Sequence, residues 1–301
     1  MTLRAVTLEG ARPCARRRTA DFLLLAKPRV VLMVLVTTAV GFHLGTLGRP
    51  DPLLLLHVLF GTGFAAAGAL ALNQFLERDL DGRMRRTERR PLPDRRLEPR
   101  DALWFGLPLV LLGPAYLALT VNALSAGVTA LTAASYLLAY TPLKRRTPLC
   151  TLLGAIPGAL PPVTGWVAAR GTLGVEAWIL FGILFLWQVP HTLAIACVHR
   201  GDYARADLRM LPVVDPEGRA TSRQVLLGCV ALFAVGLLPA LVRMAGPLYC
   251  IGAMVLGAGM LAVGIDMAIS QSCASARRLL YASLVYLPVL FVLMAVDKLR
   301  L

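Results

Sequence analysis

Residues 53–81 read LLLLHVLFGTGFAAAGALALNQFLERDLD, an apolar run that ends in amide and acid side chains. A helix needs about 20 consecutive apolar residues to cross the hydrocarbon core of a bilayer. Residues 53–76 meet that length, and the chain then continues directly into Glu77, Asp79 and Asp81. The stretch therefore predicts a membrane-spanning helix that delivers acidic groups to one surface of the membrane.

The same pattern recurs along the whole chain. Of its 301 residues, 57% are hydrophobic and 16% are charged, and the mean hydropathy is +0.68. A water-soluble domain of this composition would lack the polar surface that it needs. We expect an all-α polytopic membrane bundle with nine spans, at residues 30–47, 53–76, 103–121, 123–140, 149–168, 175–198, 224–242, 246–267 and 279–296.

The fifth span is interrupted by Pro157, Pro161 and Pro162. Proline lacks a backbone N–H and clashes with the preceding turn, so this helix should be kinked. Its freed carbonyls then need partners from neighbouring helices or from a polar cavity.

The basic residues predict the orientation of the chain. Of 31 Lys and Arg residues, 26 fall on one side of the nine spans and 5 on the other. The positive-inside rule then places the N-terminus in the cytosol and the C-terminus outside. We expect the membrane to be a bacterial cytoplasmic membrane. Residues 1–26 are interpreted as a basic cytosolic tail, and residues 27–301 as a single transmembrane domain.

The net charge of +14 is also compatible with nucleic-acid binding. The arginines are confined to loops between spans, however, which favours anionic headgroups or an anionic substrate as partners and no nucleic acid. The six cysteines form no C-x-x-C pair and most lie in apolar segments, so neither a disulfide framework nor a zinc site is expected.

Polar residues at the end of the second span share a helix face. Asn73, Glu77 and Asp81 lie within about 80° of one another at 100° per residue, whereas Asp79 points elsewhere. Amide and carboxylate oxygens suit Mg²⁺, which also binds substrate phosphates. The alternative is a solvated helix end whose acids pair with the arginines that follow.

The loop after this span adds cations in a regular spacing. Arg86 and Arg90 are four residues apart, so on a helical turn they share a face and can grip a diphosphate. An arginine cluster in a cytosolic loop is usually only a topology signal. A metal-bridged polyanion is the ligand that would use both the acids and the arginines of this loop.

Together these residues resemble a known family. The pattern from Asn73 to Leu92 is similar to the first aspartate-rich motif of the UbiA superfamily of intramembrane prenyltransferases. Three later stretches are similar to the branch of that superfamily that farnesylates haem b. They are YTPLKRRTP at 140–148, WQVPH at 187–191, and DYARA at 202–206 followed by MLPVV at 210–214.

The resemblance implies an activity and an architecture. A cavity open to the cytosolic face would bind farnesyl diphosphate, and the farnesyl group would be transferred to the vinyl group of haem b, with water completing the new side chain of haem O. The enzyme would serve respiratory oxidases and could meet haem-handling or oxidase-assembly proteins.

The resemblance also implies roles for individual residues. Mg²⁺ is expected on Glu77, Asp81 and Asp202 with support from Asn73, and all four would be catalytic. The remaining assignments are Arg86, Arg90, Lys144 and Arg145 to the diphosphate, and His191 and Trp187 to haem.

Three positions depart from the family pattern. Glu77 and Asp207 stand where aspartate and glycine are usual, and Gly201 often has an acid in its place. Glutamate keeps the charge but reaches one methylene further. Asp207 is interpreted as a solvated loop charge in preference to an added ligand.

Two alternatives remain open. One is a prenyltransferase for aromatic acids or quinone precursors, which shares the first motif but needs no haem-sized cavity. The other is a haem-binding transporter or assembly factor without chemistry, although only one span is strongly broken, whereas transporters often have paired broken helices. For His191, a satisfied core histidine is the alternative to a haem contact.

Overall fold

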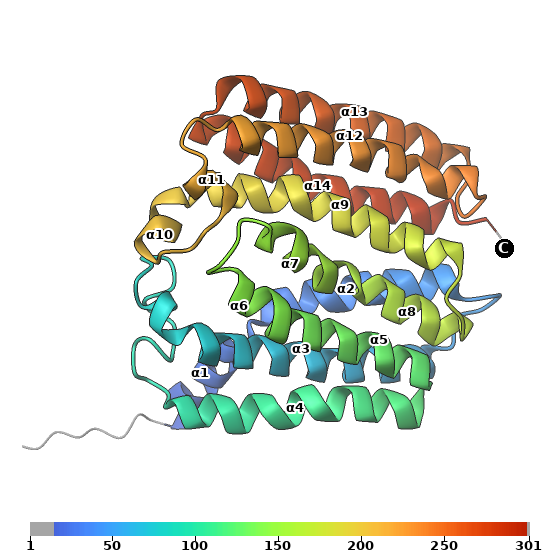
Figure 1. The fold of residues 1–301 in the computed structure, drawn as a ribbon. Helices are drawn as coiled ribbons and strands as arrows, with labels where there is room; N and C mark the ends of the chain where they lie inside the picture. The colour runs from blue at the N-terminus through green and yellow to red at the C-terminus, as the bar shows by residue number, and fades with distance from the viewer. Residues whose placement is uncertain (1–14, 300–301) are drawn as a thin grey trace, which may run out of the picture.

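The computed structural model describes residues 15–299, and within them nine helices are long and apolar enough to cross a membrane, as predicted. Their order is followed from blue to red in Figure 1. The spans are α2 (Pro28–Gly45), α3 (Pro52–Asp81), α4 (Pro99–Thr120), α5 (Ala123–Ala134) with η1 (Ser135–Tyr140) and α6 (Thr141–Leu143), α7 (Cys150–Ala159) with α8 (Pro161–Arg170), α9 (Val175–Val198), α12 (Arg219–Leu241), α13 (Pro247–Ser270) and α14 (Cys273–Val296).

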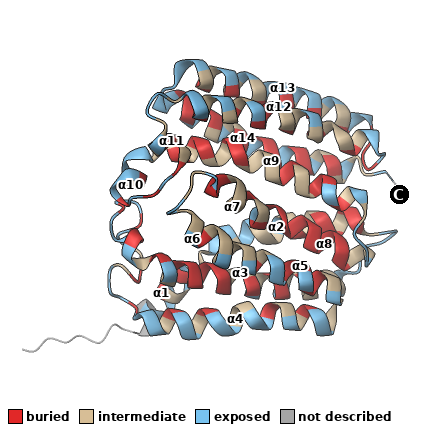
Figure 2. Cartoon of the chain, viewed as in Figure 1, coloured by how far each residue is buried: buried red, intermediate tan, exposed pale blue. Residues whose placement is uncertain are grey.

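Burial differs strongly between the centre and the edges of the bundle. The broken span α7–α8 is the most buried, and α4 is the least buried. Figure 2 shows red buried residues concentrated in α8, α9 and the inner face of α3, and pale blue exposed residues along α4 and α13. Exposed apolar side chains such as Leu111 and Val255 lie on these outer helices, which suits contact with lipid tails.

The break in the fifth span occurs at Leu160, between α7 and α8, where the prolines predicted a kink. It allows α8 to approach α2 very closely. A Cβ on Gly41 would collide with the backbone of Pro162, and a Cβ on Gly165 would collide with the backbone of Thr38. Small residues at helix interfaces permit such contacts inside a membrane.

The fourth span ends in a π-helical turn that the sequence did not predict. The backbone N–H of Thr141 bonds to the carbonyl of Tyr136, five residues earlier. Pro142 follows and has no N–H to offer to the preceding turn, which favours this wider spacing. The turn stacks Tyr136 and Tyr140, whose ring centroids lie 5.6 Å apart.

One end of the bundle, hereafter the charged end, gathers α1 (Ala15–Ala26), the loop 82–98, α10 (Arg200–Arg205) and α11 (Leu211–Val214). It lies at the left in Figure 1. Residues 15–26, part of the predicted tail, form a helix that packs on α3, and Gln74 Nε2 donates to the carbonyl of Leu25 at 2.7 Å. The first 14 residues of that tail lie outside the described residues.

Candidate functional site

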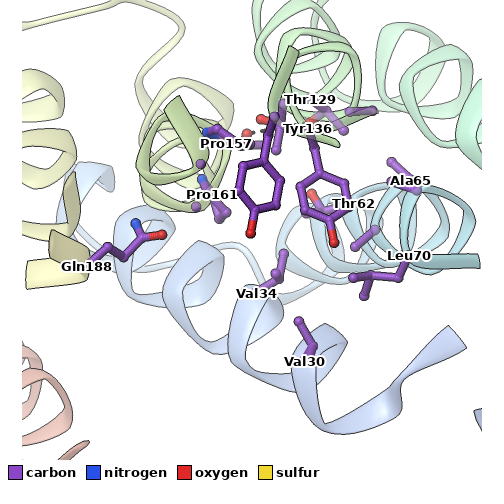
Figure 3. Close-up of a pocket in the computed structure, with 18 of the residues that line it drawn as sticks. Val30, Val34, Thr62, Ala65, Leu70, Thr129, Tyr136, Pro157, Pro161 and Gln188 are labelled. Atoms are coloured by element: carbon purple, nitrogen blue, oxygen red, sulfur yellow. Dashed lines mark hydrogen bonds between the residues drawn. The ribbon is translucent and has the colours of Figure 1, made fainter. Parts of the chain in front are cut away.

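A cavity of about 300 Å³ lies between α2, α3, α5, η1, α7, α8 and α9. Figure 3 shows Val34, Ala65 and Leu70 among the apolar side chains around it, with Gln188 from α9 on one side. Tyr136 from the π-helical turn also lines it. The lining is mainly apolar, so the cavity suits a hydrocarbon chain better than a charged ligand.

The acidic stripe of α3 faces the interior of the charged end. Asn73, Glu77 and Asp81 have exposed fractions of 2%, 5% and 1%, so all three are buried. Lys144 Nζ lies 3.3 Å from Glu77 Oε1, and Arg90 Nη1 lies 2.7 Å from Asp81 Oδ2. The predicted common face is confirmed, and it forms a cluster of alternating acids and bases.

This arrangement excludes a solvated helix end for Glu77. Arg78, the next residue, pairs instead with the exposed Asp79. Asp81 does pair with a following arginine, Arg90, but that pair is largely shielded from solvent. Removing one member of such a pair leaves an uncompensated charge, unlike the loss of a surface ion pair.

Tyr140 and Lys144 connect the cluster to the cavity. Tyr140 lines the cavity, and Lys144 Nζ lies 5.7 Å from the centre of its ring. Burial by itself would lower the pKa of Lys144, but Tyr140 and Glu77 raise it above its ordinary value. Lys144 is therefore a fixed positive charge where the apolar cavity meets the acids.

The second loop approaches the first without joining its carboxylates. Arg86 Nη2 lies 3.4 Å from the hydroxyl of Tyr203, whereas Asp202 pairs with Arg205. Among residues 15–299, no three His, Cys, Asp or Glu side chains are gathered closely enough to hold a metal ion. Glu77, Asp81 and Asp202 are therefore not brought together as the predicted ligand set.

One observation does fit a cation at Asp81. Its Oδ1 atom is buried and accepts no hydrogen bond from the described part of the chain. A buried carboxylate oxygen without a partner is costly, and a hard cation would satisfy it. The residues present are thus compatible with Mg²⁺ at this end of α3.

The other predicted cations occupy more peripheral positions. Arg145 is exposed, and Arg86 is directed to Tyr203. Asp207 has an exposed side chain that pairs with Arg83 at 3.3 Å, as expected for a solvated loop charge. Lys27, which was not among the predicted site residues, donates to Asn73 Oδ1 at 3.2 Å and completes the cluster.

His191 and Trp187 lie on a different face of α9 from the cavity. Gln188 and Thr192 line the cavity, whereas His191 Nδ1 lies 2.7 Å from Ser283 Oγ on α14. Trp187 Nε1 donates to the carbonyl of Ser283 at 2.8 Å. The rings of Trp187 and His191 stack with their centroids 4.5 Å apart. The structure thus places the predicted haem contacts against α14.

Comparison with known proteins identifies the family. A sequence model of the UbiA prenyltransferase family matches residues 34–293. The chain belongs to the UbiA prenyltransferase family. This UbiA prenyltransferase is 47% identical to a protein named protoheme IX farnesyltransferase from Solibacter usitatus, over 92% of this chain and 98% of that one. A protein of the same name from Koribacter versatilis is 41% identical, over 95% and 96%.

Solved structures show that the UbiA fold extends to distant proteins. A membrane digeranylgeranylglyceryl phosphate synthase matches this UbiA prenyltransferase with a TM-score of 0.80 at 16% identity, covering 95% of this chain and 100% of that one. A UbiA homologue from Archaeoglobus fulgidus bound to GPP and Mg²⁺ matches with a TM-score of 0.60 at 17% identity, covering 91% and 99%. At these identities the likeness concerns the fold alone.

Proposed function

We propose that this UbiA prenyltransferase transfers a farnesyl group from farnesyl diphosphate to a vinyl group of haem b. The structural observation that carries the proposal is a buried cluster of acids and cations at the end of an apolar cavity. A prenyl diphosphate has the same division into a charged head and a hydrocarbon tail. The names of relatives up to 47% identical support farnesyl and haem as the particular substrates.

The cluster would bind the diphosphate and stabilise it as it leaves. Asp81, whose Oδ1 has no partner among the described residues, is the first proposed holder of Mg²⁺. Glu77 and Asp202, which pair with Lys144 and Arg205 in this structure, would have to exchange those partners to join it, with Asn73 in support. Mg²⁺ bound there supplies positive charge to the leaving diphosphate. Fixed cations beside it perform the same task without reorganisation, which is the most effective form of electrostatic catalysis. These are Lys144 and Arg90, with Arg86 and Arg145 on the loops.

The cavity would keep the farnesyl chain away from water. Departure of the diphosphate leaves an allylic cation, and the vinyl group of haem b forms the new carbon–carbon bond with it. Water adds to the cation that results and loses a proton to solvent, which gives the hydroxylated side chain. Exclusion of bulk water until the acceptor is in place prevents premature hydrolysis.

We also propose that His191 and Trp187 contact haem. Both lie outside the cavity lining, so they would contact haem only from the α9–α14 side. We also propose that the charged end faces the cytosol of a bacterium, and that the product passes to proteins that assemble respiratory oxidases.

Purified protein incubated with haem b, farnesyl diphosphate and Mg²⁺ tests the proposal. We expect a farnesylated haem by mass spectrometry, loss of the product with excess chelator, and recovery on adding Mg²⁺. A parallel incubation with an aromatic acid as acceptor tests the other branch of the family. Conversion of the aromatic acid with haem unchanged would overturn the haem assignment, and unchanged haem with no product would favour a non-catalytic binder.

A further inference from the structure

A second cavity, of about 250 Å³, lies at the charged end among α9, α11, α12, α13 and α14. None of its lining residues belongs to the first cavity or to the cluster around Glu77 and Asp81. Charged, hydroxyl and amide side chains contribute to its wall, whereas the first cavity is mainly apolar. Drug-sized ligands occupy about 300 to 1,000 Å³, so this cavity suits a small polar molecule or the polar part of a larger one.

Two opposite charges line this cavity without pairing with each other. Arg200, the first residue of α10, makes no ion pair and no side-chain hydrogen bond within residues 15–299. Asp215 accepts both of its hydrogen bonds at Oδ2, which leaves Oδ1 without a partner in the same part of the chain. A guanidinium and a carboxylate that share a cavity but stay apart are both satisfied by a ligand with one anionic and one cationic group.

Hydrogen bonds between elements hold the wall of this cavity in place. Asp215 Oδ2 accepts from the backbone N–H and the hydroxyl of Thr221, in the first turn of α12, at 2.8 Å and 2.9 Å. Gln271 Nε2 donates to Ser222 Oγ at 3.2 Å, and Ser222 Oγ donates to the carbonyl of Ala268 at 3.3 Å. The connection between α13 and α14 is thereby tied to α12, so the cavity is formed before a ligand arrives.

The cavity lies where three helices leave the apolar part of the bundle. The apolar run of α12 begins at residue 224 and that of α13 ends at residue 267, so Ser222 and Gln271 are just outside these runs. Further along the same helices, Leu227 and Ile265 are exposed apolar side chains. Polar groups are thus at the level of lipid headgroups, and apolar side chains are at the level of the acyl chains.

We propose that this cavity binds the headgroup of phosphatidylethanolamine from the adjoining leaflet. The phosphate would bind the Arg200 guanidinium, and the ammonium would donate to Asp215 Oδ1. A choline headgroup has no N–H to donate to that carboxylate, and a glycerol headgroup has no cation. The competing explanation is general attraction between anionic lipids and a basic surface. This lipid site takes no part in the reaction proposed above.

Lipid binding to the purified full-length protein, freed of lipid in detergent, separates these explanations. Dioleoyl phosphatidylethanolamine, phosphatidylcholine and phosphatidylglycerol are added in turn, and bound lipid is counted by native mass spectrometry and by shifts in thermal unfolding. We expect phosphatidylethanolamine to bind at least about 10-fold more tightly than either of the others.

Two substitutions test the two charges separately. Arg200→Gln should weaken the binding of phosphatidylethanolamine about 10- to 100-fold, as for loss of one hydrogen bond to a charged group. Asp215→Asn keeps an oxygen for Thr221 but removes the charge, so it should bind phosphatidylethanolamine and phosphatidylcholine alike.

Arg219→Gln is the matched control. Arg219 is exposed at the start of α12, pairs with Glu217 at 3.1 Å and does not line the cavity. The substitution removes the same charge from the same surface of the protein. It should leave the affinity for phosphatidylethanolamine unchanged.

Equal losses of affinity in Arg200→Gln and Arg219→Gln would overturn the proposal in favour of general attraction. If the variants do not fold, the wild type still decides, because phosphatidylglycerol bound as tightly as phosphatidylethanolamine would overturn it as well. Glycerophosphoethanolamine, which has no acyl chains, is added as a competitor. Binding of this compound as tightly as the lipid would overturn the lipid assignment in favour of a water-soluble zwitterion.

Discussion

At the scale of single residues, Glu77 combines an unusual identity with a buried position. It stands where the resemblance to the family's first motif leads one to expect aspartate, and both of its oxygens lie within reach of Lys144 Nζ, at 3.3 Å and 3.4 Å. The additional methylene lets the carboxylate approach that lysine across the cluster. A shorter acid keeps the charge but weakens this contact, whereas an amide removes the charge.

Glu77→Gln should therefore be much more harmful than Glu77→Asp. We expect the amide to raise the activation barrier on the order of 2 to 4 kcal/mol, as for loss of one electrostatic stabiliser, and the aspartate to be tolerated. Measured kcat/KM for haem farnesylation tests this. Asp79→Asn is the control, since Asp79 is exposed on the same helix end and, among the described residues, pairs with Arg78 alone. Near-normal turnover by Glu77→Gln would remove Glu77 from the metal assignment.

Lys27 should make stability depend on pH in a defined direction. Burial and Arg90 lower its pKa to about 7 in the folded protein, against an ordinary value of 10.5, although Glu77 and Asp81 act in the opposite direction. Between these values the unfolded chain binds more protons, so the contribution of Lys27 to stability rises with pH.

Thermal unfolding of the wild type and of Lys27→Met in detergent measures this contribution. The midpoint of thermal unfolding of the variant should exceed that of the wild type most below pH 7. The difference between the two midpoints should shrink as the pH rises toward 10.5. A difference that does not change with pH would show that the lysine is not desolvated.

The sequence allowed some of the residues of the candidate site to be predicted and not others. The stripe of Asn73, Glu77 and Asp81 was predictable because helical spacing alone puts these residues on one face. Lys27 was not, because a lysine just before a span is indistinguishable from a topology signal until its backbone conformation is known. The orientation of His191 depends on how α9 rotates against α14, which local spacing does not determine.

Among the helices, α2 and α8 pack so closely that a single added methyl group tests their contact. Gly165→Ala would place a Cβ against the backbone of Thr38, and backbone cannot move as a flexible side chain does. We expect a loss of stability of about 1 to 3 kcal/mol, as for overpacking of a filled core. Thermal unfolding in detergent measures it.

Gly127→Ala on α5 is the matched control, because a Cβ there meets nothing within 4 Å. Its midpoint should be unchanged or slightly higher, since alanine favours a helix more than glycine does. Equal destabilisation by both substitutions would mean that the close approach of α2 and α8 is not what limits stability.

Within residues 15–299, hydropathy located all nine spans, but it marked only the apolar part of several helices. Helix α3 continues to Asp81, as the shared face of its polar residues predicted, and α12 begins at Arg219, in each case through polar residues outside the apolar run. Hydrogen bonds within a helix continue after the apolar stretch ends, so hydropathy marks the bilayer and not the helix. In α3 that polar extension is the part that carries the candidate site.

At the scale of the whole molecule, the distribution of basic residues predicts which way the bundle sits in the membrane. With 26 of 31 Lys and Arg residues on one side, a reporter enzyme fused after Leu301 should be active only outside the cytosol. A fusion within the loop 82–98 should behave in the opposite way. Activity of the C-terminal fusion in the cytosol would reverse the proposed orientation of the charged end.

The π-helical turn at Ser135–Tyr140 has a consequence for how this chain tolerates changes in length. A π turn holds one residue more than an α turn, so it takes up one residue without rotating the segment that follows. Deleting a single residue between 135 and 140 would let the segment relax to an α-helix and would leave the direction of Lys144 nearly unchanged. The same deletion within α5 would instead rotate Lys144 by about 100° relative to the residues before it, and Lys144 would lose Glu77. The chain should therefore tolerate a shortening at the π turn that it does not tolerate in the rest of this span.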